Sequence, residues 1–118
     1  MSGPILVVNP NSNTAVTQGI SDALNGLRFT GGPEIECLTL AEGPFGIESQ
    51  VDSDSVILPL VRLVQSRPDA AAVVIACYSD PGIDAVRSVA TCPVFGIQES
   101  GTLMAMARGD RFGVKSLQ

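Results

Sequence analysis

A continuous apolar run is the feature that most restricts the fold of this chain. Residues 70–78 are apolar or nearly so, and they lie between Pro68 and the turn-forming residues 79–82. A short apolar run with turn residues at both ends is typical of a strand buried on both faces of a parallel sheet. Cys77 lies at the carboxyl end of this run. Because open parallel sheets bind ligands beyond the carboxyl ends of their strands, the run predicts a thiol at a ligand-binding edge.

The position of Cys77 alone supports two interpretations equally. In the functional one, the thiol acts at the sheet edge, and the amides from Tyr78 onward stabilise its thiolate if they open a helix. In the structural one, Cys77 is a small buried side chain, since free cysteine is among the most buried residue types.

The rest of the chain alternates strand patterns with helix patterns. Further strands are predicted at residues 5–8, 35–40 and 93–97, and residues 111–114 are typical of the start of another. Helices are predicted over residues 16–27, 56–64, 83–89 and 99–108. Such alternation implies parallel pairing through right-handed crossovers. We therefore expect one α/β domain spanning residues 1–118, with an open parallel sheet of four or five strands and helices on both faces.

Some local details are also predicted. Residues 52–55 are N-cap candidates for the second helix, and Pro59 inside that helix predicts a late start or a kink. Alternation in the second strand places Cys37 in the core. Cys92, beside Pro93 at a strand entrance, is expected at the opposite end of the sheet from Cys77, in a structural role.

The amino-acid composition restricts the class of partner and the side chains that are available for acid–base chemistry. With 45% hydrophobic and 16% charged residues, the 118-residue chain can bury a core. Its net charge of −5, without a basic cluster, argues against nucleic acid and favours a small-molecule partner. The absence of histidine removes the commonest general base and the commonest metal ligand. Any acid–base role therefore falls to cysteine, carboxylates or tyrosine, and no metal is expected.

Three features of the sequence indicate the cellular location of the protein: its cysteines, its first residues and the length of its apolar runs. The three cysteines are widely spaced, which fits neither a disulfide framework nor a zinc site and indicates a reducing compartment, the cytoplasm. Residues 1–4 lead directly into a strand, so we expect no signal peptide. No apolar run reaches the roughly 20 residues that span a bilayer, so no membrane partner is expected.

Four segments combine into a pattern with a known counterpart. They are Ile-Leu-Val-Val-Asn-Pro-Asn-Ser at 5–12, Gly-Pro with Ile-Glu at 43–48, Ala-Cys-Tyr-Ser-Asp-Pro-Gly at 76–82 and Val-Phe-Gly-Ile-Gln-Glu at 94–99. Together, and over nearly the whole chain, they resemble the aspartate/glutamate racemase superfamily. The cysteine segment is the most specific piece: Tyr-Ser-Asp-Pro-Gly looks like the hydantoin and allantoin racemase branch, whereas glutamate and aspartate racemases usually have Asn-Thr there.

The resemblance implies a flavodoxin-like racemase lobe and a cofactor-free isomerase. Members carry two similar α/β lobes, each supplying a catalytic cysteine, and they invert a carbon next to a carbonyl. One thiolate removes the proton and the opposite thiol returns one. By this resemblance Cys77 is one of the two acid–base residues, no cofactor is needed, and the substrate is a 5-substituted hydantoin, an allantoin-like compound or an amino-acid derivative.

Several loop residues are candidates for substrate binding. They are Asn9, Asn11, Ser12, Glu48, Tyr78, Ser79 and Asp80. The asparagine amides could donate to substrate carbonyls, although an Asx-turn or helix cap explains them equally well. Ser79 and Asp80 also fit a plain turn, with their backbone amides of more interest than their side chains. Glu48 also fits a solvated loop residue, and Glu99 a carboxylate at a helix N-terminus.

The resemblance predicts a second lobe with the partner cysteine, and this chain ends about where that lobe begins. Residues 115–118 depart from the family pattern. Neither Cys37 nor Cys92 is placed to replace the partner, so we expect poor racemisation by this chain alone. Uncovered apolar surface should favour at least a homodimer. The alternatives are a non-catalytic α/β module that binds a small carbonyl compound or forms oligomers, and a related isomerase that uses Cys77 as a nucleophile.

Overall fold

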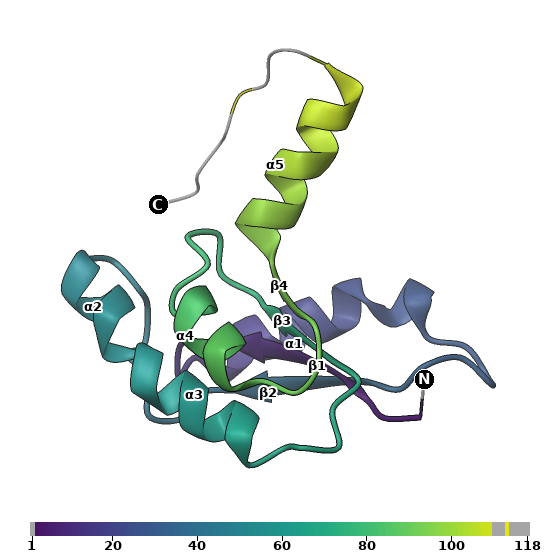
Figure 1. Cartoon of the computed structure of the whole chain (residues 1–118), viewed down its shortest axis with the longest axis horizontal. Helices are drawn as coiled ribbons and strands as arrows, with labels where there is room; N and C mark the ends of the chain where they lie inside the picture. Colours follow the sequence, from purple (N-terminus) through teal and green to yellow (C-terminus); the bar gives the residue numbers. More distant parts are fainter. Residues whose placement is uncertain (1, 110–112, 114–118) are drawn as a thin grey trace.

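Four parallel strands form the centre of the fold (Figure 1). This computed structural model describes residues 2–109 and 113. The strands are β1 (Ile5–Asn9), β2 (Ile35–Thr39), β3 (Ala72–Ile75) and β4 (Val94–Gly96). Their order is β2-β1-β3-β4, and each neighbouring pair is parallel. The predicted parallel α/β sheet is thus confirmed, with four strands, while the expected strand start at 111–114 falls outside the described residues except for Gly113.

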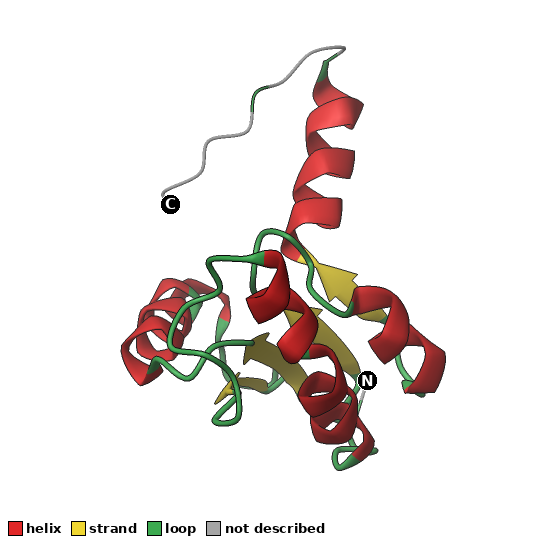
Figure 2. Ribbon diagram, turned by 90° about the vertical axis from the view of Figure 1, so that its left-hand side faces the viewer, coloured by secondary structure: helices red, strands yellow, loops and turns green. Residues whose placement is uncertain are grey.

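Helices cover both faces of the sheet, as predicted. They are α1 (Thr14–Ala23), the 3₁₀ turn η1 (Asn25–Leu27), α2 (Gln50–Ser55), α3 (Ile57–Gln65), α4 (Ile83–Val89) and α5 (Ile97–Arg108). Figure 1 shows α3 and α4 on one face and α1 on the other. Figures 1 and 2 both show α5 leading away from the sheet at the end of β4. Among the helices of residues 2–109, none is long and apolar enough to cross a bilayer.

The core lies between the sheet and helices α3 and α4. Successive strand side chains point to opposite faces, and those of β1 and β3 that face α3 and α4 are fully buried. The core residues are Leu6, Val8, Leu40, Val56, Leu60, Val64, Ala70, Val73, Ile75, Val86 and Val94. Burial of this apolar surface stabilises the fold by about 25 cal/mol per Å². The packed sheet in turn holds the loops at its edge in place.

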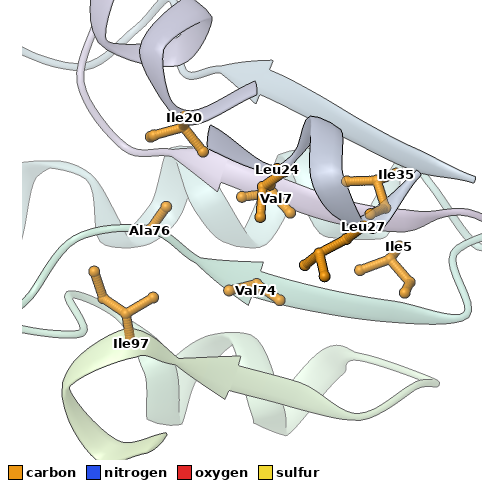
Figure 3. Close-up of a pocket in the computed structure, with 9 residues that line it drawn as sticks. All are labelled: Ile5, Val7, Ile20, Leu24, Leu27, Ile35, Val74, Ala76 and Ile97. Carbon is orange, nitrogen blue, oxygen red and sulfur yellow. The ribbon is translucent and has the colours of Figure 1, made fainter. Parts of the chain in front are cut away.

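The opposite face is less completely covered. Side chains of β1 and β3 surround an open hollow of about 370 Å³ with residues of α1, η1 and the start of α5 (Figure 3). Its lining is apolar: Ile5, Val7, Ile20, Leu24, Leu27, Ile35, Val74, Ala76 and Ile97. None of the residues of α1 or α5 is fully buried. This face therefore leaves apolar side chains accessible.

Cys37 lies on the α1 side of β2 and not in the buried core, so that expectation was wrong. The residues of β2, including Cys37, are only partly buried because β2 is an edge strand. The Sγ atom of Cys37 is 3.7 Å from Nη2 of Arg28. The predicted alternation itself holds, since Thr39 on the same face meets Thr17 of α1, with 2.6 Å between their Oγ1 atoms.

The helix predicted over residues 56–64 is α3, which begins at Ile57, and the short helix α2 precedes it, with Val56 between the two. The N-cap of α2 is Ser49, whose Oγ accepts a hydrogen bond from the N–H of Asp52 at 3.1 Å, so the candidates at 52–55 lie inside the helix and were wrong as caps. Pro59 falls in the first turn of α3. Its missing N–H costs nothing there, because the first turn has no intrahelical acceptor for it.

Candidate active site

The loops after β1 and β2 are joined by backbone contacts at the carboxyl edge of the sheet. The N–H of Ser12 donates to the carbonyl oxygen of Pro44 at 2.8 Å. A Cβ on Gly43 would lie 2.5 Å from the carbonyl oxygen of Pro10, so a side chain at this position would force the loops apart. The structure thus brings Ser12 and the Gly-Pro loop together.

The side chain of Asn9 is occupied within its own loop. Asn9 is 1% exposed, and its Nδ2 donates to Oδ1 of Asn11 at 2.8 Å and to Oγ1 of Thr17 at 3.0 Å. Its Oδ1 accepts from the N–H of Asn11 at 3.3 Å. A primary amide has only two N–H donors, and Asn9 uses them within the fold. Asn9 therefore stabilises the conformation of the loop.

Asn11 is better placed to meet a ligand. Its Oδ1 accepts from Asn9 and from the N–H of Asn13 at 2.9 Å, which fixes the orientation of the side chain. Among the described residues, Nδ2 of Asn11 has no hydrogen-bond acceptor, and the residue is only partly buried. The buried Asn9 therefore orients a second amide whose donors are available.

Cys77 lies just beyond the carboxyl end of β3, which ends at Ile75. Its side chain is partly buried, and its Sγ is 3.9 Å from the Oγ of Ser79. The N–H of Asp80 donates to the carbonyl oxygen of Cys77 at 2.9 Å, which closes a turn. The thiol thus stands at the sheet edge that the apolar run predicts.

The amides that follow Cys77 form a turn and not the start of a helix. Helix α4 begins only at Ile83, after Gly82 adopts the left-handed conformation with φ of 72°. The amides from Tyr78 onward therefore do not form a helix N-terminus, which is the arrangement that was expected to stabilise a thiolate at Cys77. Pro81 and Gly82 delay the helix, since glycine adopts a positive φ without steric cost.

Asp80 binds the first turn of α5. Its Oδ1 accepts from the N–H of Gln98 at 2.9 Å, and its Oδ2 accepts from the N–H of Glu99 at 2.8 Å. The N-cap residue of α5 is Gly96, which has no side chain to do this. Helix α5 accordingly begins at Ile97, before the predicted start at Glu99, because its cap comes from another loop.

Glu99 also forms an ion pair with Arg87 of α4, a residue that is not among the predicted site residues. Arg87 Nη1 is 3.0 Å from Oε2 of Glu99, and Arg87 Nη2 donates to the carbonyl oxygen of Val94 at 2.8 Å. The hydrogen bond from Arg87 lowers the pKa of Glu99, and the same bond raises the pKa of Arg87. No local pattern marks this pair, because its members lie on different helices.

The second loop and the cysteine loop share a small polar hollow. It has a volume of about 260 Å³ and is lined by Ile47, Glu48, Ser49, Gln50, Ser53 and Ser79. Glu48 is exposed, and its N–H donates to Oδ2 of Asp52 at 3.0 Å. Tyr78 is 42% exposed. The predicted residues Glu48 and Ser79 therefore meet at one hollow, while the larger apolar hollow offers no polar side chain to orient a substrate.

The described residues show no cluster of three or more His, Cys, Asp or Glu side chains that could hold a metal ion. Cys92 packs against the core, and burial raises the pKa of its thiol. It precedes β4, whereas Cys77 follows β3, so the two lie toward opposite ends of the parallel sheet. Both observations agree with the structural role expected for Cys92.

Comparison with known proteins identifies the family. The sequence model described as Asp/Glu/hydantoin racemase matches residues 5–117. The chain belongs to this racemase family. It is 35% identical over 118 residues to the hydantoin racemase of Paenarthrobacter aurescens, in an alignment covering 96% of this chain and 49% of that protein. It is also 35% identical over 112 residues to the hydantoin racemase of Pseudomonas sp. (strain NS671), covering 93% of this chain and 45% of that protein.

A solved structure supports the same assignment for this racemase-family chain. The allantoin racemase from Klebsiella pneumoniae superposes with a TM-score of 0.81 and 31% identity, over 90% of this chain and 44% of that one. The resemblance and the α/β fold predicted from the sequence are thereby confirmed. The chain spans about half the length of the curated relatives it matches.

Proposed function

We propose that this chain carries one acid–base half of a cofactor-independent racemase site, with Cys77 as the proton-transferring group. The observation that carries the proposal is the partly buried thiol of Cys77 beyond β3, in a chain of the racemase family. A thiol suits the task because an unperturbed thiol has a pKa of about 8.5, close enough to physiological pH for the group to act as base or acid.

The proposed step breaks the C–H bond next to a carbonyl group. The proton moves to the sulfur of Cys77, and the electron pair delocalises into the carbonyl as an enolate. Return of a proton to the same face restores the starting enantiomer, whereas a second acid on the opposite face gives inversion. Hydrogen-bond donors at the carbonyl oxygen stabilise the enolate, and Asn11 has an amide available for this purpose.

The proposed substrates are 5-substituted hydantoins or allantoin-like compounds. Hydantoin racemases and an allantoin racemase are the named relatives, which favours this class over free amino acids. The polar hollow beside Glu48 and Ser79 offers groups of the right kind for a ring of amides and carbonyls. Asn9 contributes indirectly, by holding Asn11, and exposed Tyr78 would form the rim.

We further propose that one chain alone exchanges the substrate proton but inverts poorly. Cys37 lies on the α1 side of an edge strand and Cys92 lies before β4, so neither faces Cys77 across a substrate. The three free cysteines of this chain also support a reducing compartment, for which we propose the cytoplasm.

Solvent-deuterium uptake tests the proposed function directly. An optically pure 5-substituted hydantoin incubated in D₂O with the protein should gain deuterium at C5 while its optical rotation declines slowly. Cys77→Ser should abolish the uptake, and the matched variant Cys92→Ser should keep it.

Two results would contradict this proposal in different ways. Rapid loss of rotation that disappears in Cys77→Ser would show that a second acid is present, supplied by a second copy. Thermal stabilisation by hydantoins without any deuterium uptake would identify a binding module in place of an enzyme.

We also propose that the chain forms at least a homodimer through α5 and the adjoining open apolar face. Phe95, Ile97, Leu103, Met104 and Met106 are between 40% and 60% exposed. Ile97 lines the apolar hollow, Phe95 precedes it in β4, and the remaining three lie farther along α5. Such exposed apolar area is typical of association sites.

Sedimentation equilibrium tests the association. The protein should sediment at twice its monomer mass of 12.2 kDa or more, and Met104→Lys should shift it toward the monomer. Leu58→Lys, at another exposed apolar residue remote from α5, serves as the control. A monomer at all concentrations would overturn the proposal.

A further inference from the structure

Asp80 connects the loop that carries Cys77 to helix α5. Its main chain closes the turn through the N–H bond to the carbonyl oxygen of Cys77, at 2.9 Å. Its side chain holds the N–H groups of Gln98 and Glu99 with one carboxylate oxygen each. One residue thus hydrogen-bonds the site loop on one side and the first turn of a helix on the other.

We propose that Asp80 is a positioning residue that clamps the cysteine loop against α5 and so sets how far the Cys77 thiol is exposed. In this role the carboxylate of Asp80 does not contact the substrate. Both of its oxygens are already used by backbone amides, whose bonds to a charged acceptor are among the stronger hydrogen bonds in proteins.

Gly96 lies directly against the carboxylate of Asp80. A Cβ at Gly96 would lie 2.2 Å from Cγ of Asp80 and 2.4 Å from its Oδ1, a separation that real Cβ atoms do not show. The carboxylate cannot simply swing away without losing its two amide bonds. Glycine at position 96 is therefore required for Asp80 to reach the helix.

The backbone of Asp80 supports the same conclusion. Its φ of 49° is in the left-handed region, the one such case among the non-glycine residues that the structure describes. This conformation is uncommon for a non-glycine residue, although aspartate adopts it more readily than most, and surrounding contacts favour it. The turn to Cys77 and the two bonds to α5 supply those contacts.

The first turn of α5, to which the Asp80 carboxylate binds, is itself restrained. Arg87 holds Glu99 through its guanidinium and also donates to the carbonyl oxygen of Val94, so the first turn of α5 is tied to α4 and β4. Beyond that turn α5 has no fully buried residue. Movement of α5 would therefore reach the cysteine loop through Asp80.

The clamp is tested by the alkylation rate of Cys77 with iodoacetamide, followed by peptide mass spectrometry between pH 6 and 10. Asp80→Ala and Gly96→Ala should each speed the labelling of Cys77 at least threefold, and Asp80→Asn, which keeps one acceptor, should have an intermediate effect. Gly101→Ala is the matched control, because a Cβ there meets no atom within 4 Å. Cys92 in the same samples reports on global unfolding.

Amide hydrogen exchange separates positioning from simple helix capping. The proposal predicts faster exchange in Asp80→Ala both at residues 77–82 and at residues 97–100, with the strands of the core unchanged. If only the α5 amides speed up and the Cys77 labelling rate stays within 1.5-fold, Asp80 is a helix cap and the proposal is overturned. It is also overturned if Cys92 labelling rises in parallel in Asp80→Asn and Gly96→Ala, since that result means general unfolding.

The catalytic consequence rests on the function proposed for Cys77, whereas the labelling result does not. Where the wild-type protein takes up deuterium into a hydantoin, Asp80→Ala should lower that rate at least tenfold with little change in substrate binding. Absence of uptake by the wild-type protein would contradict the proposed function and leave the labelling comparison to decide on the clamp.

Discussion

Arg87 on α4 and Glu99 on α5 form an ion pair that ties the two helices together beside the cysteine loop, with Nη1 and Oε2 3.0 Å apart. Both side chains are more than a third exposed, so solvent screening keeps the contribution of the pair to global stability small. Its importance is local, since α5 has few other attachments to the sheet. Glu99→Gln should increase amide exchange in α5 with little change in melting temperature.

The same pair predicts a pH dependence. Because Arg87 lowers the pKa of Glu99 in the folded chain, the anchoring is fully present above the ordinary value of 4.5 and is lost as pH falls through the lowered folded value. Exchange in α5 should therefore rise on acidification below pH 4.5, measured by mass spectrometry and corrected for intrinsic rates. In Glu99→Gln this acid response should weaken but not vanish, since the Asp80 carboxylate also binds the first turn of α5; an unchanged response would mean that Glu99 does not control it.

Leu58 and Leu60 lie two residues apart on α3 in opposite environments. Leu60 is 1% exposed, whereas Leu58 is 66% exposed. Leu60→Ala removes buried methyl groups and leaves a cavity, and we expect it to lower the free energy of unfolding by about 2–5 kcal/mol. Leu58→Ala should change it by about 0.5 kcal/mol or less. Urea denaturation of both variants measures the difference, and equal costs would place the core elsewhere.

Asn9 should matter for stability and for ligand binding. Asn9→Ala leaves Asn11 and Thr17 without their donor, and we expect a loss of about 1–3 kcal/mol in the free energy of unfolding. The freed side chain of Asn11 should also weaken any stabilisation by hydantoins. Urea denaturation and a thermal shift with hydantoin measure the two effects. A stable variant that binds normally would show that the buried network is dispensable.

Cys92 should react slowly with thiol reagents. Burial raises the pKa of its thiol above the ordinary value of 9.0, so less thiolate is present near neutral pH. Its alkylation rate should keep increasing above pH 9, as followed by peptide mass spectrometry. A plateau well below pH 9 would contradict the buried environment.

Local patterns were sufficient for the main elements and for the family. The apolar run before residues 79–82 predicted a buried parallel strand, and β3 lies within it. Apolar spacing predicted α4 at residues 83–89, as observed. These features depend on residues close together in the chain. The racemase resemblance likewise came from short segments, of which the one around Cys77 was the most specific.

Tertiary contacts decided the rest of the site. The carboxylate of Asp80 meets amides at positions 98 and 99, and Arg87 meets Glu99 across two helices. The partial exposure of Cys37 follows from the edge position of β2. Nothing local marks such long-range pairs, because their energies depend on which elements the folded sheet brings together. The sequence alone therefore determined a thiol at the end of a parallel strand, and only the folded chain determined which residues hold its loop.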